Sequence, residues 1–320
     1  MIRQVLYFPY IRVPQSAWLT QILLYWETVG SIVPYEFIAK PEELGPYMQQ
    51  LLLEELVIQV QPGAYLQLLP EFSAAFIRYL EHLGPELEVR RRSFTAHRVA
   101  QIHMEKLRDA QDLLTDAGLA HPANSPWVDV ESETADDFMC YLATCLGQMP
   151  EVNSLPLTDT GRTLDRVLSG GVGERDMEAQ LQSLRMQVLE RVLPIPVHEL
   201  EPAEIRHFKN KHGNALIHFR LRVEQELVRL AAIESDILRA KGVTLFIEEA
   251  REETREIRHW MKVARWKSGV ANVGGIFSAV PGVRPVYGLL NAVREALVGR
   301  APPPPPMDFA YAAHVEATFE

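Results

Sequence analysis

The densest group of side chains that could do chemistry lies between residues 206 and 218. It contains Arg206, His207, Lys209, Lys211, His212 and His218. Histidine can bind a metal, whereas arginine and lysine bind anions. Ligands that share a metal on one helix are usually three or four residues apart, but these histidines are five and six apart. The spacing argues against a metal. It leaves open a solvated face with salt bridges or a site for an anionic partner, formed by Arg206, Lys209, Lys211 and His212.

A second group of titratable residues is His97, His103 and Glu105, which we expect on a helix spanning residues 95–118. The two histidines are six residues apart, so a shared metal is not expected. Three carboxylates, Glu133, Asp136 and Asp137, crowd the first turn of a later helix, where negative charge is favourable. Acid–base chemistry would need a facing partner, and the sequence identifies none.

Two glycine-rich stretches could be taken for phosphate-binding loops. Residues 169–173 read SGGVG, and Gly274-Gly275 lie in a second stretch. A phosphate loop follows a strand and leads into Lys-Ser/Thr or a comparable helix start, and neither stretch does so. The sequence therefore predicts no nucleotide site and no cofactor.

Charge and cysteine content exclude further classes. The 320-residue chain has a formal net charge of −10, so its overall field repels nucleic acid. The one dense basic run, residues 90–92, is interpreted as a solvated helix entry or a set of interdomain salt bridges, and a phosphate contact stays open as the alternative. Cys140 and Cys145 would lie about 140° apart on a helix, which suits neither a disulfide nor a metal. We expect free thiols, no signal peptide and a cytoplasmic location.

The N-terminal part predicts short strands mixed with helices. Residues 5–10 form a strand, and a helix with Trp18, Ile22, Tyr25, Trp26 and Val29 on one face begins near Ser16. Residues 57–61 and 64–68 flank Pro62-Gly63, which predicts a hairpin after a helix, as in a winged helix. Residues 41–89 are strongly acidic, so such a wing would contact protein and not DNA.

The C-terminal part predicts two long amphipathic helices. An apolar stripe runs from Ile205 to Ile237, with a kink or a close contact at Gly213. A second helix spans residues 245–267, and Gly242 is expected in the bend of an antiparallel pair. The fold class is therefore mainly α, of the α+β type. The expected regions are residues 1–94, 95–194 and 195–300, a polyproline linker at 301–306 and a docking tail at 307–320.

Residues 266–298 form an apolar segment rich in glycine. The uncharged run of sixteen residues is shorter than the roughly 20 that a spanning helix needs, and glycine and proline weaken it. A buried helical hairpin is favoured, in which Gly274, Gly275, Ile276 and Pro281 allow close packing. A conditional contact with a membrane stays open as the alternative.

The stretch LYFPYIRVPQSAWLTQILLYWETVGSIVP resembles the start of an uncharacterised bacterial family, known only as a domain of unknown function. The fragments IHMEKL, LPLTD, VLPIP and FKNKHGNALIHFR are similar to it as well. The resemblance is scattered over residues 5–223. It implies a bacterial cytosolic protein and carries no activity or catalytic residue.

Three functions remain. The first is a non-enzymatic interaction or assembly protein, with a protein partner or a second copy, in a bacterial multi-protein system such as anti-phage defence. The second is a membrane-active effector that inserts residues 266–298. The third is an enzyme whose site is assembled from distant residues, for example His207, His212 and Glu105. A polar pocket holding converging titratable groups would favour the third.

Overall fold

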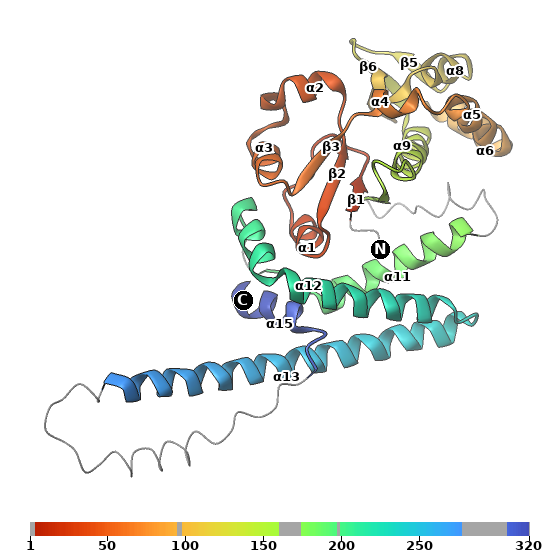
Figure 1. The fold of residues 1–320 in the computed structure, drawn as a ribbon. Coiled ribbons are helices and arrows are strands. Elements are labelled where there is room, and N and C mark those ends of the chain that lie inside the picture. Colours follow the sequence, from red (N-terminus) through yellow and green to blue (C-terminus); the bar gives the residue numbers. More distant parts are fainter. Residues whose placement is uncertain (1–3, 95–97, 160–173, 197–198, 277–305, 320) are drawn as a thin grey trace, which may run out of the picture. The chain divides into compact units, whose positions relative to one another are not determined.

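The computed structural model describes residues 4–94, 98–159, 174–196, 199–276 and 306–319 (Figure 1). The chain divides into two compact units. Unit 1 comprises Met1–Gln182 and Glu199–Lys209, and unit 2 comprises Ser183–His198 and Asn210–Glu320. Helices dominate, and the strands lie in the N-terminal part, so the expected α+β class is confirmed.

Unit 1 is built on a parallel sheet of four strands. The strands are β1 (Gln4–Tyr7), β2 (Thr28–Ile32), β3 (Val57–Val60) and β7 (Ser154–Leu157), in the order β3-β2-β1-β7. They are rich in buried apolar residues, as a sheet covered on both faces requires. The chain moves outward from β1 to β2 and β3 and then crosses to β7 on the other side of β1. Ligands of such sheets bind at the carboxyl ends of the strands, where the order reverses.

The connections of this sheet begin with α1 (Ala17–Tyr25) and end with α9 (Ser132–Gly147). The Ser16 hydroxyl accepts a hydrogen bond from the Leu19 N–H at 3.2 Å, which confirms the expected helix start. The prediction that this helix includes Val29 is wrong. Residues 28–32 read TVGSI, and they pair with β1 on one side and β3 on the other. After β2 come α2 (Tyr35–Ala39), η1 (Pro41–Leu44) and α3 (Pro46–Leu53).

The hairpin expected at residues 57–68 is absent from this described part of the chain. Its first half is β3, but β3 pairs in parallel with β2. Pro62 then begins a helix, α4 (Pro62–Leu66), which suits a proline at the first helical position. The winged-helix interpretation is therefore wrong. Two further helices follow, α5 (Phe72–His82) and α6 (Pro85–Ser93).

A second, antiparallel sheet has the strand order β4-β6-β5. Its strands are β4 (Val99–His103), β5 (Ala120–Pro122) and β6 (Trp127–Glu131). The single helix expected at residues 95–118 is wrong, because β4 pairs with β6 and is followed by α7 (Met104–Leu107) and α8 (Ala110–Asp116).

Helix α9 lies in the common core of unit 1. It contacts β1 and β7 of the first sheet and β4 and β6 of the second. Its Phe138 packs edge-on against Phe72 and Phe76 of α5. Since β7 also pairs with β1, the boundary expected at residue 94 is wrong: residues on both sides of it share one core.

Unit 2 contains most of two long helices, α12 (Pro202–Ala231) and α13 (Asp236–Ile276), which run antiparallel as predicted (Figure 1). The bend lies at residues 232–235, and Gly242 is inside α13, where an added Cβ would lie 2.6 Å from Leu230 Cδ2. Helix α12 is kinked at His212, beside the predicted Gly213. A third helix, α11 (Glu174–Val192), is held to α12 by Arg185, which donates two hydrogen bonds to the Glu224 carboxylate at 2.6 and 2.7 Å.

The C-terminal tail docks on unit 2, as the sequence predicted for residues 307–320. Phe309 and Tyr311 are buried at the start of α15 (Ala310–Phe319), and both rings contact Phe219 of α12. Arg258 of α13 pairs with Glu316. Residues 301–305 of the predicted proline linker lie outside the described residues.

Helix α13 continues through Gly274, Gly275 and Ile276. The rest of the predicted hairpin, with Pro281, lies outside the described residues. Among the helices that the structure describes, none combines the length and the apolar character that a membrane span needs.

Candidate functional site

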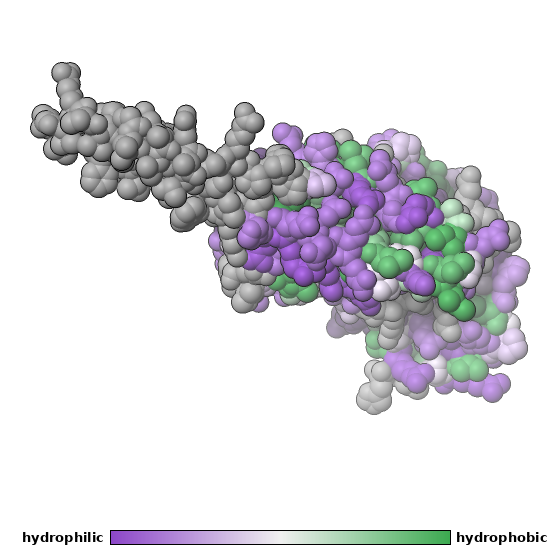
Figure 2. Space-filling model, turned by 90° about the horizontal axis from the view of Figure 1, so that it is seen from below, coloured by the Kyte–Doolittle hydropathy of each residue, from purple (hydrophilic) through white to green (hydrophobic). Residues whose placement is uncertain are grey.

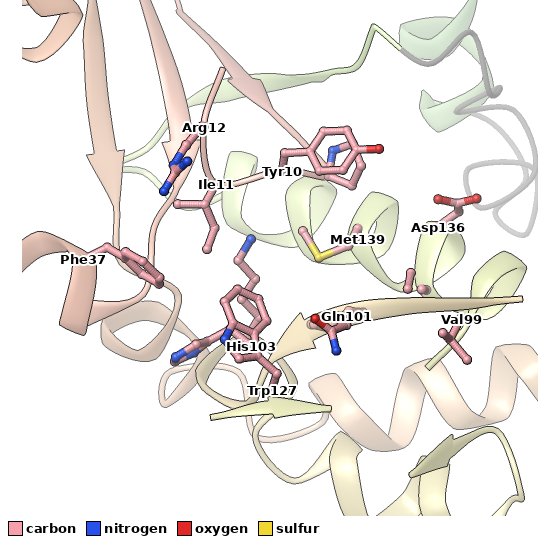
Figure 3. Close-up of a pocket in the computed structure, with 15 residues that line it drawn as sticks. Tyr10, Ile11, Arg12, Phe37, Val99, Gln101, His103, Trp127, Asp136 and Met139 are labelled. Atoms are coloured by element: carbon pink, nitrogen blue, oxygen red, sulfur yellow. The ribbon is translucent and has the colours of Figure 1, made fainter. Parts of the chain in front are cut away.

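A cavity of about 660 Å³ lies in unit 1 where the loops that follow the parallel strands meet the second sheet (Figure 3). Its walls come from the loop after β1 (residues 9–12), from Phe37 on α2, from β4 and Trp127 of the second sheet, and from α9. This position agrees with the place where parallel sheets bind ligands. We call it the sheet-edge cavity.

The wall of the sheet-edge cavity is mainly apolar, but several titratable side chains line it. They are Tyr10, Arg12, His103, Lys106 and Asp136. Arg12 is exposed and donates a hydrogen bond to the Glu43 carbonyl at 2.5 Å. Figure 3 shows the His103 ring beside Trp127, with Met139 on the facing helix. Such a site fits an organic molecule of metabolite size.

Lys106 is the most unusual residue of the cavity. It lies on α7 and is only 3% exposed. Within the described parts of the chain, its ammonium group has no hydrogen bond and no ion pair. Burial lowers the pKa of Lys106 from its usual value to about 7, so close to half of the amine is unprotonated at neutral pH.

His103 ends β4 and lies next to Lys106 in the cavity wall. Its Nδ1 accepts a hydrogen bond from the Glu105 N–H at 3.2 Å, so the neutral ring carries its proton on Nε2. Nε2 lies 3.1 Å from Glu36 Oε1, although the angle does not align a hydrogen bond. Burial lowers the pKa of His103, and Glu36 opposes this shift. The pair can hold and move one proton.

Glu105 fixes the short helix that carries Lys106. Its carboxylate accepts hydrogen bonds from the Tyr35 N–H at 2.6 Å, the Gly63 N–H at 3.3 Å and the Gln61 amide at 3.2 Å. These groups follow β2 and β3. A Cβ on Gly63 would lie 2.8 Å from Glu105 Oε1, so a larger residue there would displace this carboxylate. Glu105 therefore ties α7 to the carboxyl ends of two parallel strands.

A buried ion cluster fixes the helix on the other side of the cavity. Arg90 is 2% exposed and pairs with Asp137 at 2.8 Å, Glu86 at 2.9 Å and Glu133 at 3.6 Å. The Tyr79 hydroxyl donates to Asp137 at 3.2 Å. This confirms the salt-bridge reading of the basic run for Arg90. It also fixes the first turn of α9 beside Asp136.

The predicted anion-binding residues have other roles where the structure shows their contacts. Lys209 is buried, and its Nζ donates to the Trp26 and Glu27 carbonyls at 2.6 and 2.9 Å, at the end of α1. Arg206 pairs with Glu55 at 2.5 Å. Lys211 is exposed, and the His212 ring lies against His314 with centroids 4.0 Å apart. The anion-binding hypothesis stays a prediction for these last two residues.

Glu105 belongs to the predicted enzyme site, whereas Lys106 and Glu36 were not predicted. Glu105 turns out to orient the site, whereas His212 lies in unit 2. Cys140 and Cys145 are free, as expected. No cluster of metal ligands occurs among the described residues. A sequence signal for the site does exist: His103 ends the segment VAQIH, and Glu105 and Lys106 follow within the next three residues.

Comparisons with protein-family models, with curated proteins and with solved structures found no match, so the resemblance to an uncharacterised bacterial family stays a prediction.

Proposed function

We propose that unit 1 is an enzyme that acts on a small organic molecule in the sheet-edge cavity. The observation that carries this proposal is the meeting of Lys106 and His103 in the wall of one cavity beyond the carboxyl ends of parallel strands, with Glu36 3.1 Å from the His103 ring. This favours the third of the functions left open by the sequence. Buried titratable groups with shifted pKa values in a cavity are typical of catalytic sites.

The cost of the arrangement supports a functional role. A buried amine without an acceptor destabilises a fold, and a methionine would fill the same space without that cost. Glu105 adds three hydrogen bonds that hold the adjacent residue in place, from groups in two other loops. Polar contacts thus orient α7, whereas the Lys106 amine in the cavity wall has no partner among the described residues. Structural lysines show the opposite pattern.

The test is ligand binding to the full chain. A library of small aldehydes, ketones, amines and acids is screened by the shift in melting temperature. Ala100→Phe, which places a ring into the cavity wall, should abolish the shift of any true ligand. Leu53→Phe, at an exposed site of unit 1, is the matched control and should keep it. A screen without a ligand, or ligands that bind both variants equally, would contradict the proposal.

A second candidate function rests on unit 2 and continues the assembly hypothesis. Val228, Ile237, Leu238 and Leu245, which we call the apolar patch, are 57 to 82% exposed near the bend between α12 and α13. Figure 2 shows exposed apolar surface next to a strongly hydrophilic stretch. Exposed apolar side chains gathered in this way are typical of interfaces.

We infer that a second copy of the chain covers the apolar patch. Charged residues near the patch form ion pairs within the chain: Asp236 with Arg239 at 2.7 Å, and Glu226 with Arg229. Because these charges are paired, two copies that meet at the patch would repel each other little. Light scattering after size-exclusion chromatography tests this. We expect a dimer that Leu238→Asp converts to a monomer, while Leu53→Asp has no effect. A monomer for the unmodified chain at high concentration would refute it.

A further inference from the structure

We propose that Lys106 is the nucleophile of the sheet-edge cavity, and that it forms an imine with an aldehyde or ketone. This inference rests on the proposed function, since it names the reacting group and the substrate class of the same site. It is carried by the position of the side chain in the cavity wall, its burial and its lack of a partner within the described residues.

The chain contains its own comparison in Lys209. Both lysines are buried, at 3% exposure for Lys106 and 8% for Lys209. Lys209 donates to two backbone carbonyls and thereby holds the end of α1, which is what a structural lysine does. Lys106 makes no such contact, and a cavity lies beside it. A structural role explains the burial of Lys209 but does not explain the burial of Lys106.

The surroundings favour the unprotonated amine that nucleophilic attack requires. The cavity wall around Lys106 includes Ile11, Phe37, Trp127 and Met139. Such apolar surroundings destabilise the protonated, charged form of the amine. Desolvation of this kind is one of the ways in which enzymes activate a lysine for carbonyl chemistry. The same apolar and aromatic walls favour a carbonyl compound with an apolar body.

The reaction balances with groups that are present. The Nζ lone pair attacks the carbonyl carbon, a C–N bond forms, the C=O π bond breaks, and one proton passes from nitrogen to oxygen to give a carbinolamine. The second nitrogen proton then passes to the hydroxyl oxygen as the C–O bond breaks and water leaves, so one carbonyl and one amine give one imine and one water. His103 lines the same wall, but its Nε2 is buried 3.1 Å from Glu36 Oε1, so both proton transfers are written directly between nitrogen and oxygen.

Trapping with benzaldehyde tests the inference on the full chain. Sodium cyanoborohydride delivers hydride to the imine carbon and leaves a stable N-benzyl lysine, which peptide mass spectrometry locates. At neutral pH an ordinary lysine is unprotonated in only about one molecule in 2,500, whereas a pKa of about 7 leaves a large share of Lys106 unprotonated. We therefore expect labelling at Lys106 to exceed that of the exposed Lys40, Lys211 and Lys241 by at least about 100-fold.

Two variants complete the experiment. Lys106→Met should lose the fast labelling, because methionine carries no amine. It should keep the fold, because the methionine side chain is similar in size to that of lysine. Lys241→Arg, an exposed lysine away from the cavity, should label as the unmodified chain does. Equal labelling of Lys106 and the exposed lysines would overturn the inference, as would fast labelling that survives in Lys106→Met.

The outcome separates this inference from the proposed function. Benzyl alcohol has the shape of the probe but cannot form an imine, and its binding is read from the melting temperature. If it binds the unmodified chain and not Ala100→Phe, while Lys106 is not labelled, the cavity binds ligands and the imine step is wrong. If no compound binds and Lys106 is not labelled, both proposals fail.

Discussion

Lys106 links the stability of unit 1 to pH in a direction that can be checked. Its pKa is about 7 in the folded chain and near 10.5 in the unfolded chain, so between these values the unfolded state binds more protons. The free energy of unfolding therefore rises with pH across this window. The penalty is fully present below pH 7 and disappears as the pH approaches 10.5.

Lys106→Met removes this penalty. We expect the variant to unfold at higher urea concentration than the unmodified chain at pH 7. The difference in unfolding free energy should shrink by about 1.4 kcal/mol for each pH unit between pH 7 and 10. Urea titrations followed by tryptophan fluorescence at several pH values measure it, with Lys241→Met as the control. A difference that does not change with pH would show that the amine is protonated in the fold.

Helix α9 depends on a close approach at its C-terminal end. An added Cβ at Gly147 would lie 2.2 Å from the Ser154 carbonyl oxygen of β7, and a backbone atom of a central core element cannot move aside cheaply. Gly147→Ala should therefore destabilise unit 1 by more than about 2 kcal/mol, in the range of overpacked cores. Thermal unfolding measures the loss.

Gly213→Ala is the matched control for that substitution. No atom would lie within 4 Å of the new Cβ, and α12 should gain up to about 1 kcal/mol from the better helix former. If both variants were destabilised equally, the close contact between α9 and β7 would not be the cause.

Helix α15 completes the core of unit 2. Phe309 is fully buried and contacts Phe219 of α12 and Phe246 of α13. Phe309→Ala should cost about 3–5 kcal/mol, because it leaves a cavity between three helices. Circular dichroism during urea unfolding measures the cost, and Thr318→Ala, on the exposed side of α15, should leave the midpoint unchanged. A neutral Phe309→Ala would mean that the tail does not dock in solution.

The same elements show what local sequence patterns could and could not predict. The long stripes of α12 and α13 and the Ser16 start of α1 are local signals, and they are confirmed. The helical patterns of the sequence run into β2 and β4, because a strand of five residues is too short to show a period of its own. What makes them strands is pairing with distant segments, β1 and β3 for the first and β6 for the second.

At the scale of the whole molecule, the candidate site could not be predicted either, because it also depends on contacts between distant segments of the chain. Its wall combines residues 9–12, Phe37, residues 99–103, Lys106, Trp127, residues 135–136 and Met139. The richest short window, residues 99–106, contains only six of these fifteen residues. The burial that sets the chemistry of Lys106 exists only after both sheets and α9 have assembled. The sequence shows that a lysine is present, and only the fold shows that its side chain is buried from solvent.

The two units carry different proposed roles, so the two roles should be separable in the full chain. Leu238→Asp should shift the particle from dimer to monomer and leave N-benzyl labelling of Lys106 unchanged, because the apolar patch belongs to unit 2 and the cavity to unit 1. Lys106→Met should abolish the fast labelling and leave the dimer intact. Light scattering and peptide mass spectrometry on the same samples measure both quantities. Loss of Lys106 labelling in Leu238→Asp would instead mean that assembly through unit 2 is required to form the cavity. That outcome would contradict the assignment of separate functions to the two units.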